Sequence, residues 1–381
     1  MNEMMQKLER SEGYLAADPG NTDLLGMVID LSLSLGLLER AAAHAATALE
    51  RYPDDAYFRS RQGSVCLARQ DWAGAVAIFA PLLGAFADVN LAYNLAYAYV
   101  WMGRHADACL AMAPYMEAAD LPVPALTLVI RALHHSGDSE RAMALVERHL
   151  PRCQGEPDFL AAASLLYLDG DQLERAGQLS EAALAAAEAL GRARRPLEAL
   201  VVAGTLALAG TDAAAAVRHF DEVIARSPAE GRAWSALGAA SLLRQDLPAA
   251  RAQLEQALVY LPKHIGSWHL LGWCHIFGGD LAGAHDAFAT ALALDRNFGE
   301  SHGGMAVVQA MRGERALAEA SIARALGLDA EGLSARYAQM VLSGATADPA
   351  RFRVLAGRLL SSRKGAFGLN LNELLARHES R

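Results

Sequence analysis

Apolar residues recur along this chain at spacings of three and four, in stretches separated by short turns rich in glycine, asparagine and aspartate. Such spacing gathers the apolar side chains on one face of an α-helix. In residues 231–262, two stretches of this kind flank a turn at 245–246, and in the next pair the turn at 278–280 contains two glycines. Glycine adopts the positive φ angles that often end a helix. The pattern therefore predicts a chain of antiparallel helix pairs.

The helix pairs at 231–264 and 265–298 share a sequence pattern that is shifted by 34 residues. Gly238 and Ala250 lack side-chain bulk, so the two helices of the first pair can approach closely while larger residues fill the space around them. The second pair repeats this order of large and small residues. The corresponding positions are Trp234, Leu237, Gly238, Ala250, Leu254 and Ala257 in the first pair and Trp268, Leu271, Gly272, Ala284, Phe288 and Ala291 in the second.

This period and this order of residues resemble the tetratricopeptide repeat, in which W-x2-L-G-x2-Y is followed by A-x3-F, an alanine and a proline. The resemblance implies an all-α fold, a right-handed superhelical solenoid of antiparallel helix pairs. Extended along the chain, the frame predicts nine repeats, which begin near Thr22, Ala56, Val89, Val123, Pro157, Leu197, Gly231, Ile265 and Gly299. The twentieth position of every repeat is an alanine: Ala41, Ala75, Ala108, Ala142, Ala176, Ala216, Ala250, Ala284 and Ala318.

The spacing departs from 34 residues most clearly at 191–196, where six extra residues follow the repeat that begins at Pro157. They are expected to lengthen the second helix of that repeat and to form a joint. The last repeat of a solenoid must cover its apolar face, so a cap is expected at each end. We predict an N-terminal cap at 1–21, five degenerate repeats at 22–190, the joint at 191–196, four more regular repeats at 197–332, and a C-terminal helical cap at 333–381, with helical spacing at 333–342, 349–361 and 369–378.

Composition fits a large helical protein with a continuous core, because 53% of the residues are hydrophobic and 20% are charged. The net charge of −9 and the pI near 5.7 argue against a nucleic-acid partner, whose phosphates would need neutralising. Nearly all positive charge is arginine, a bias typical of a GC-rich, bacterial coding sequence. The densest basic cluster, Arg192, Arg194 and Arg195, is open to two interpretations: an anionic-ligand site, or a solvated helix end near the joint.

The apolar stretches are too short to cross a membrane. None reaches the roughly 20 residues that a membrane-spanning helix needs, and the longest, such as 121–130, contain prolines. Residues 1–10 include glutamate, lysine and arginine with no apolar region behind them, so we expect no secretory signal. The expected location is the cytoplasm.

Residues with catalytic or metal-binding chemistry do not form a known motif. The four cysteines fall in different repeats with no C-x-x-C pair, and no two histidines stand at i and i+4, as a zinc site on one helix needs. This leaves a metal site assembled from several repeats as the alternative. The stretch 301–304, Ser-His-Gly-Gly, resembles part of an oxyanion-hole loop, but His302 stands at the repeat's tryptophan position, where packing is its expected role. We expect no cofactor, no metal and no enzyme activity.

Function is expected on the concave surface, which in the tetratricopeptide repeat family is lined mainly by positions 2, 5, 9, 12 and 13 of each repeat. Aromatic residues with a polar group suit peptide grooves, because they bury a large area at low entropic cost and still form hydrogen bonds. A frame shifted by one residue would bury them instead. The predicted groove residues are Asn90, Tyr93, Tyr97 and Trp101 in one repeat, Arg131, His134 and His135 in the next, and His269, Trp273, Ile276 and Phe277 in the repeat that begins at Ile265.

Some co-chaperones of this family bind the C-termini of heat-shock chaperones with a basic and asparagine clamp at positions 2, 5, 6 and 9. This chain does not reproduce the clamp, and Asn90 and Asn94 match it only in part. The four positions read Arg232, Ser235, Ala236 and Ala239 in one repeat and Gly266, His269, Leu270 and Trp273 in the next. We therefore expect a protein or peptide partner of apolar or mixed character, such as a helix laid in the groove, instead of an anionic tail.

The leading hypothesis is a non-catalytic adaptor or scaffold that holds a protein segment along its concave surface. The alternative is a dedicated chaperone or assembly factor for a bacterial secretion, pilus or envelope-polymer system, which predicts one client instead of several. A peptide-sensing regulator would need an N-terminal helical bundle. The repeats are expected to begin near residue 22, which leaves no room for such a bundle before them. An enzyme is the remaining class, and turnover by the pure protein would refute the scaffold.

Overall fold

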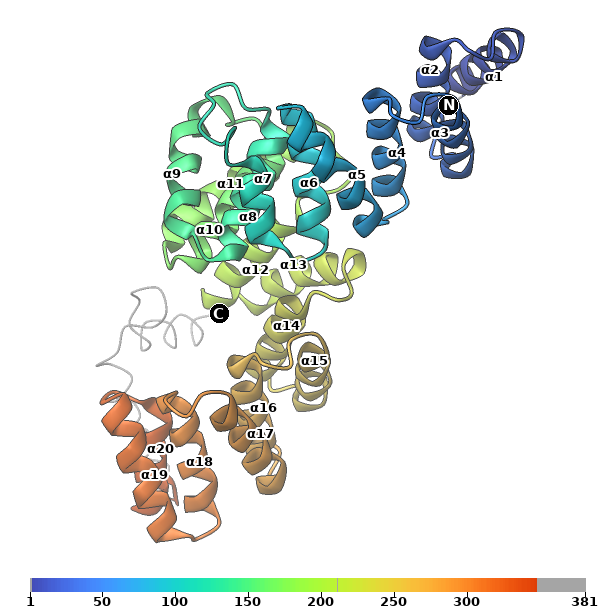
Figure 1. Cartoon of the computed structure of the whole chain (residues 1–381). Helices are drawn as coiled ribbons and strands as arrows, with labels where there is room; N and C mark the ends of the chain where they lie inside the picture. The colour runs from blue at the N-terminus through green and yellow to red at the C-terminus, as the bar shows by residue number, and fades with distance from the viewer. Residues whose placement is uncertain (1, 211, 348–381) are drawn as a thin grey trace. The chain divides into compact units, whose positions relative to one another are not determined.

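The computed structural model describes residues 2–210 and 212–347, and within them the chain forms twenty α-helices and two short 3-10 helices, with no β-strand (Figure 1). The predicted all-α fold of antiparallel helix pairs is confirmed. Contacts divide the chain into an N-terminal unit, Met1–Leu166, and a C-terminal unit, Tyr167–Arg381. Each unit has its own buried apolar clusters.

The first helix of each repeat begins at the residue where the sequence pattern predicts that a repeat starts. These helices are α2 (Thr22–Ser34), α4 (Ala56–Ala68), α6 (Val89–Trp101), α8 (Val123–Ser136), α10 (Pro157–Asp169), α12 (Leu197–Ala209), α14 (Gly231–Leu243), α16 (Ile265–Phe277) and α18 (Gly299–Met311). The predicted frame is therefore confirmed at all nine starts.

The second helices carry the alanine of the twentieth position, and in every repeat that alanine is at most 1% exposed. Its small side chain lets the second helix lie close against the first. These helices are α3 (Leu38–Arg51), α5 (Trp72–Ala85), α7 (His105–Met112), α9 (Ser139–His149), α11 (Leu173–Ala189), α13 (Ala213–Arg226), α15 (Leu247–Tyr260), α17 (Leu281–Leu294) and α19 (Arg315–Leu328). The remaining elements are α1 (Asn2–Ala17), α20 (Leu333–Leu342), η1 (Leu150–Arg152) and η2 (Ala345–Ala347).

An aspartate caps the second helix in five repeats. Its carboxylate accepts a hydrogen bond from the backbone N–H three residues later, at donor–acceptor distances between 2.9 and 3.3 Å. An N-cap of this kind stabilises a helix by about 1 kcal/mol. The caps are Asp71, Asp138, Asp212, Asp246 and Asp280.

The eighth position of a repeat lies against the large side chain of the twenty-fourth. A Cβ built on Gly272 would lie 2.6 Å from Cζ of Phe288, whose side chain is fully buried, and a Cβ on Gly63 would lie 2.6 Å from Cζ of Phe79. Both distances are too short for a real contact. Glycine is therefore required where the two helices of these repeats cross.

The fourth position of several repeats donates a hydrogen bond to the backbone carbonyl six residues earlier. Trp234 Nε1 lies 2.8 Å from the carbonyl oxygen of Pro228, and Trp268 Nε1 lies 2.9 Å from that of Pro262. His302 Nε2 lies 2.9 Å from the carbonyl oxygen of Arg296. Because a carbonyl oxygen only accepts, Nε2 of His302 carries the proton. His302 thus replaces the repeat's tryptophan in a structural role, as expected.

The six extra residues at 191–196 follow α11, which has 17 residues while α13 and α15 have 14. The hydroxyl of Ser180 in α11 donates to the carbonyl of Ala199 in α12 at 2.9 Å, and both residues are buried. Arg195 pairs with Glu222 in α13. The first contact joins α11 directly to α12, and the second ties the segment to the repeat that follows it. The division into two repeat modules at this point remains a prediction.

One ion pair in the C-terminal unit skips a repeat. Arg232 of α14 donates from Nη1 to both carboxylate oxygens of Asp169 in α10, at 3.1 and 3.0 Å. The repeat formed by α12 and α13 lies between them along the chain. The pair therefore braces two repeats that are not neighbours in sequence.

The last α-helix described in the C-terminal unit is α20, which lies against α18 and α19 (Figure 1). Glu300 of α18 accepts hydrogen bonds from the backbone N–H groups of Leu333 and Ser334, at 2.8 and 3.2 Å, and so caps α20 from outside. The predicted helical segments at 349–361 and 369–378 lie outside the described residues. Among the helices that the structure describes, none combines the length and apolar character that crossing a membrane requires.

Candidate functional site

An aromatic ladder in the N-terminal unit is the first candidate site. Tyr93, Tyr97 and Trp101 follow one another at intervals of four on α6, and their successive ring centroids are each 6.2 Å apart. Trp72, at the start of α5, stacks on Trp101 with centroids 5.6 Å apart and an interplanar angle of 9°. Trp72 also meets Tyr97 edge-on at 6.1 Å. We call these four residues the α6 ladder.

The α6 ladder faces away from the buried side of its helix. Asp88 caps α6, and Ala92, Leu95 and Ala96 turn into the protein. Tyr93 and Tyr97 are half-buried, while Trp101 is 59% exposed. A helix with small residues on its buried face can pack tightly and still present large side chains on the opposite face. The ladder therefore combines fixed ring positions with an open end at Trp101.

The polar residues predicted beside this ladder come from α6 and α8. Burial raises the pKa of the Tyr93 hydroxyl, the nearby Tyr97 raises it further, and Arg131 on α8 lowers it in part. Tyr93 thus offers a neutral hydroxyl that can donate and accept hydrogen bonds. Asn90 is exposed in the first turn of α6. The structure therefore brings Arg131 close to the ladder that the sequence predicted.

The histidines at the end of α8 form a separate stack. His135 lies between His134, at a centroid distance of 5.4 Å, and His105 of α7, at 4.8 Å. His134 is half-buried and His135 is exposed. The sequence analysis did not predict His105 for this stack, because it lies on a second helix and the predicted groove positions lie on first helices.

A second ladder lies in the C-terminal unit, on α16. His269, Trp273 and Phe277 again stand at intervals of four, at the same repeat positions as Tyr93, Tyr97 and Trp101. Trp273 Nε1 donates to His269 Nε2 at 3.1 Å. Because an indole N–H only donates, His269 must carry its own proton on Nδ1. We call these three residues the α16 ladder.

Burial controls the chemistry of the α16 ladder. Desolvation lowers the pKa of His269, and Glu300 opposes that shift. Its Nδ1 is buried without a hydrogen-bond partner among the described residues. Phe298 and Phe288 meet the His269 ring edge-on, at 6.1 and 5.4 Å. His269 is therefore a neutral, apolar-packed ring.

The outer end of the α16 ladder is open. Phe277 is 60% exposed, and Trp273 is held between Phe277 at 5.7 Å and Tyr337 of α20 at 5.8 Å. Ile276, predicted at the groove, is only 6% exposed and belongs to an apolar cluster with Phe288. Side chains of α17 and α18 cover it in that cluster. We therefore place Ile276 in the core and not in the site.

The sequence analysis did not predict three residues that contact the ladders: Trp72 in the α6 ladder, and Phe298 and Tyr337 beside the α16 ladder. Trp72 belongs to a second helix, which the groove positions of the first helix do not cover. The sequence could have predicted Tyr337 as a groove residue. One more 34-residue step beyond Gly299 begins a repeat at Leu333 and places Tyr337 at its fifth position. That is the position of Tyr93 and His269.

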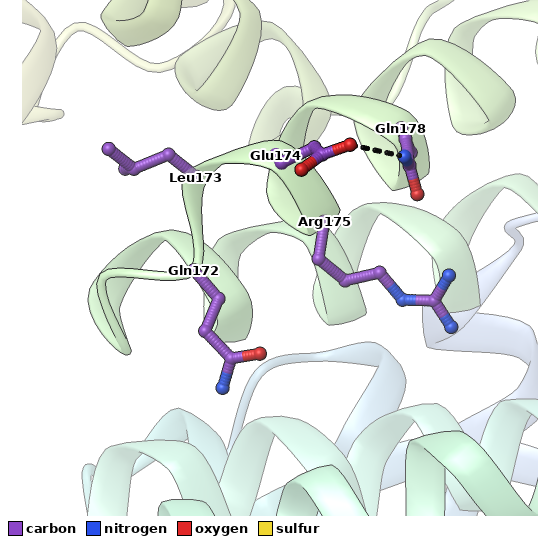
Figure 2. Close-up of a pocket in the computed structure, with 5 residues that line it drawn as sticks. All are labelled: Gln172, Leu173, Glu174, Arg175 and Gln178. Carbon is purple, nitrogen blue, oxygen red and sulfur yellow. Dashed lines mark hydrogen bonds between the residues drawn. The ribbon is translucent and has the colours of Figure 1, made fainter. Parts of the chain in front are cut away.

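A shallow hollow of about 420 Å³ lies at the start of α11 (Figure 2). Gln172, Leu173, Glu174, Arg175 and Gln178 line it, and Glu174 accepts a hydrogen bond from Gln178 at 3.5 Å. These side chains surround the exposed first turn of one helix. The hollow therefore lacks the buried polar groups of a built binding site.

The described residues contain one contact that resembles a catalytic pair. His264 Nδ1 lies 2.7 Å from the Ser267 hydroxyl, which donates to Ser235 at 2.8 Å. Ser267 is fully buried, so a substrate has no access to it, and His264 caps α16. Burial also raises the pKa of the Cys66, Cys109, Cys153 and Cys274 thiols. No group of three possible metal ligands occurs in the part of the chain that the structure describes.

The model of the tetratricopeptide repeat family matches this chain at residues 30–90 and 201–264. No curated protein matches it. Solved structures do, with 277 matching chains. One, the APC/C hetero-tetramer Cut9–Hcn1, is 13% identical over 89% of this chain and 93% of the other, with a TM-score of 0.41. MamA is 15% identical over 43% of this chain and 93% of its own, with a TM-score of 0.36.

Proposed function

Because the chain is a tetratricopeptide repeat protein, we propose that it is a non-catalytic scaffold that holds a segment of a partner protein against the α6 ladder. The observation that carries this proposal is the stacked pair of Trp72 and Trp101, with Trp101 59% exposed. Large aromatic side chains supply much of the binding energy at protein interfaces. An exposed tryptophan whose ring is already fixed loses little further entropy when a partner covers it.

The chemistry beside the ladder defines the partner. The Tyr93 hydroxyl and Arg131 give polar contacts at one end, and Trp72 and Trp101 give an apolar surface at the other. A segment with an apolar anchor and one or two hydrogen-bonding groups fits both. It is a segment of mixed character, such as one face of an amphipathic helix.

The test compares two exposed apolar residues of the same unit. Trp101→Ala removes the open end of the ladder, and Leu110→Ala is the matched control, because Leu110 on α7 is 72% exposed and outside the ladder. Each variant and the native chain are used to isolate partners from the source cells, and each purified partner is then titrated. We expect Trp101→Ala to weaken binding at least tenfold, or about 1.4 kcal/mol, and Leu110→Ala to have no effect. Equal affinities for all three proteins would refute the proposal.

The second candidate is a dedicated chaperone or assembly factor. It is supported by the presence of the α16 ladder, because two aromatic sites on one chain suit a long client segment. The titration distinguishes the two functions. A dedicated factor binds one client and loses affinity when either Trp101 or Phe277 is replaced by alanine, whereas a general scaffold binds several partners, each sensitive to one ladder.

A further inference from the structure

Two asparagines run beside the rings that α6 contributes to its ladder. Asn90 precedes Tyr93 by three residues and Tyr97 by seven. Asn94 stands in the same relation to Tyr97 and Trp101. Residues three and seven apart lie on one face of a helix. The asparagines therefore share the exposed face of α6 with the rings, as a second row with the same interval of four residues.

The side-chain amides of this second row are free to bind a ligand. The backbone N–H of Asn90 donates to the capping carboxylate of Asp88 at 2.8 Å, but no side-chain hydrogen bond of Asn90 or Asn94 occurs among the described residues. Asn90 is exposed, and the half-buried Asn94 does not belong to the buried polar groups that lack a partner. An amide has both donors and an acceptor. Each asparagine can therefore donate to a carbonyl and accept from an N–H of the same ligand.

The interval within the two rows restricts the conformation of the partner. Successive rings on α6 are 6.2 Å apart. An extended strand places every second side chain on one face, at intervals of about 6.4–6.8 Å. A second helix also matches the rings, through residues four apart that are separated by about 6 Å. A polyproline II helix does not, because its side chains return to one face only after three residues, or about 9.3 Å.

The amides distinguish the two conformations that match the rings. In a helix the backbone N–H and C=O groups are paired with one another, so a partner helix would cover the asparagines and leave them without a backbone partner. In an extended strand the N–H and C=O of every second residue point to the same edge. That interval is close to the one between Asn90 and Asn94. Each amide can then bind both backbone groups of one partner residue, whatever its side chain.

We propose that Asn90 and Asn94 hold the backbone of the partner segment in an extended conformation along α6, with its alternate side chains on the rings of the α6 ladder. This contact rests on the proposed function, because it concerns the partner of the same ladder. The asparagines select the conformation of the segment, and the rings select its side chains. The segment therefore carries apolar or aromatic residues at alternate positions over about five residues.

The test uses peptides that are selected for binding. A library of random 20-residue peptides, long enough to form helices, is displayed on phage and selected on the full-length protein. An enriched peptide whose binding requires Trp101 is then synthesised. We expect Asn90→Leu and Asn94→Leu each to weaken its binding about tenfold, through the loss of two hydrogen bonds. Gln62→Leu is the matched control and should have no effect, because Gln62 is an exposed amide on α4, outside the ladder.

Modified forms of the same peptide test the backbone contact directly. N-methylation of alternate residues removes the N–H groups of one edge of an extended segment. In one register it should weaken binding about tenfold, and in the other register it should have little effect. The difference between registers should become smaller in Asn94→Leu. A C-terminal amide in place of the carboxylate should leave the affinity unchanged, because the segment is held along its length.

Several results would overturn the proposal. A helical conformation of the bound, isotope-labelled peptide in NMR spectra would do so, and so would equal effects of both N-methylation registers. A loss of affinity on amidation would show that a terminal carboxylate is bound instead. Native affinity in both asparagine variants, together with lost affinity in Trp101→Ala, would refute the backbone contact and leave the proposed function intact. If no enriched peptide depends on Trp101, the proposed function fails, and the backbone contact fails with it.

Discussion

The indole ring of Trp101 lies parallel to that of Trp72, at a centroid distance of 5.6 Å. Trp72 begins α5 and Trp101 ends α6, so the stacking joins the second helix of one repeat to the first helix of the next. The position of the exposed ring therefore depends on the packing between repeats. A change that alters this packing alters the surface offered to a partner.

Removing the ring of Trp72 should disturb the position of the Trp101 ring. We expect Trp72→Ala to abolish the exciton signal of the tryptophan pair in circular dichroism and to lower the free energy of unfolding by about 1 kcal/mol, the usual contribution of an aromatic pair. Trp72→Phe keeps a ring beneath Trp101 and should retain most of that stability. An unchanged exciton signal in Trp72→Ala would contradict the stacking seen in the structure.

Two glycines in helices offer opposite predictions for the same substitution. A Cβ on Gly272 would lie 2.6 Å from the buried ring of Phe288, so Gly272→Ala should destabilise the protein by about 1–3 kcal/mol through overpacking. A Cβ on Gly327 in α19 would have no atom within 4 Å, and Gly327→Ala should stabilise by about 0.5–1 kcal/mol through helix propensity. Chemical denaturation of both variants measures the difference. Equal effects of the two substitutions would show that the Gly272 site tolerates a side chain.

Tryptophan, which occupies the same position of the preceding repeat as Trp268, should be able to replace His302. His302→Trp retains an N–H that can reach the carbonyl of Arg296, as Trp268 reaches that of Pro262 at 2.9 Å. We expect it to be as stable as the native chain, whereas His302→Phe loses the donor and about 0.5–1.5 kcal/mol. Thermal and urea unfolding test both variants. If phenylalanine proves as stable as tryptophan, the hydrogen bond has no part in stability.

The buried ring of His269 predicts a dependence of stability on pH. Burial lowers its pKa, so the unfolded chain takes up a proton at a higher pH than the folded one. Stability is then fully present above about pH 6.5, the ordinary histidine pKa, and falls as the pH drops below it. Glu300 opposes the shift, and His149, His219 and His264 have pKa values lowered by burial as well.

Replacing His269 with a residue that does not titrate isolates its contribution to the pH dependence of stability. Glutamine keeps an acceptor for the indole N–H of Trp273 and takes up no proton in this range, so His269→Gln should lose less stability than the native chain between pH 7.5 and 5.5. Urea unfolding at both values gives the comparison. The control is His285→Gln, because His285 has a side chain 42% exposed. The same loss in native and His269→Gln proteins would refute a contribution from His269.

The sequence located the helices better than it located the surfaces. The repeat starts were predictable because close helix crossings demand small residues, such as Gly272 and Ala284, at fixed intervals. Ile276 and Phe277 differ by one residue and about 100° around α16, yet one is buried and the other is exposed. That difference depends on how α17 and α18 cover the helix, and a single repeat pattern carries no information about it. Trp72 was missed for a related reason, because it reaches the ladder from a second helix.

The ion pair between Arg232 and Asp169 has a mechanical consequence. An array whose repeats touch only their neighbours stretches like a spring, since each interface yields independently. A link from α10 to α14 places three repeats under one restraint, so this part of the chain is stiffer than the repeats on either side. Exposed ion pairs weaken as salt screens them. The compliance of this segment under tension should therefore increase with ionic strength.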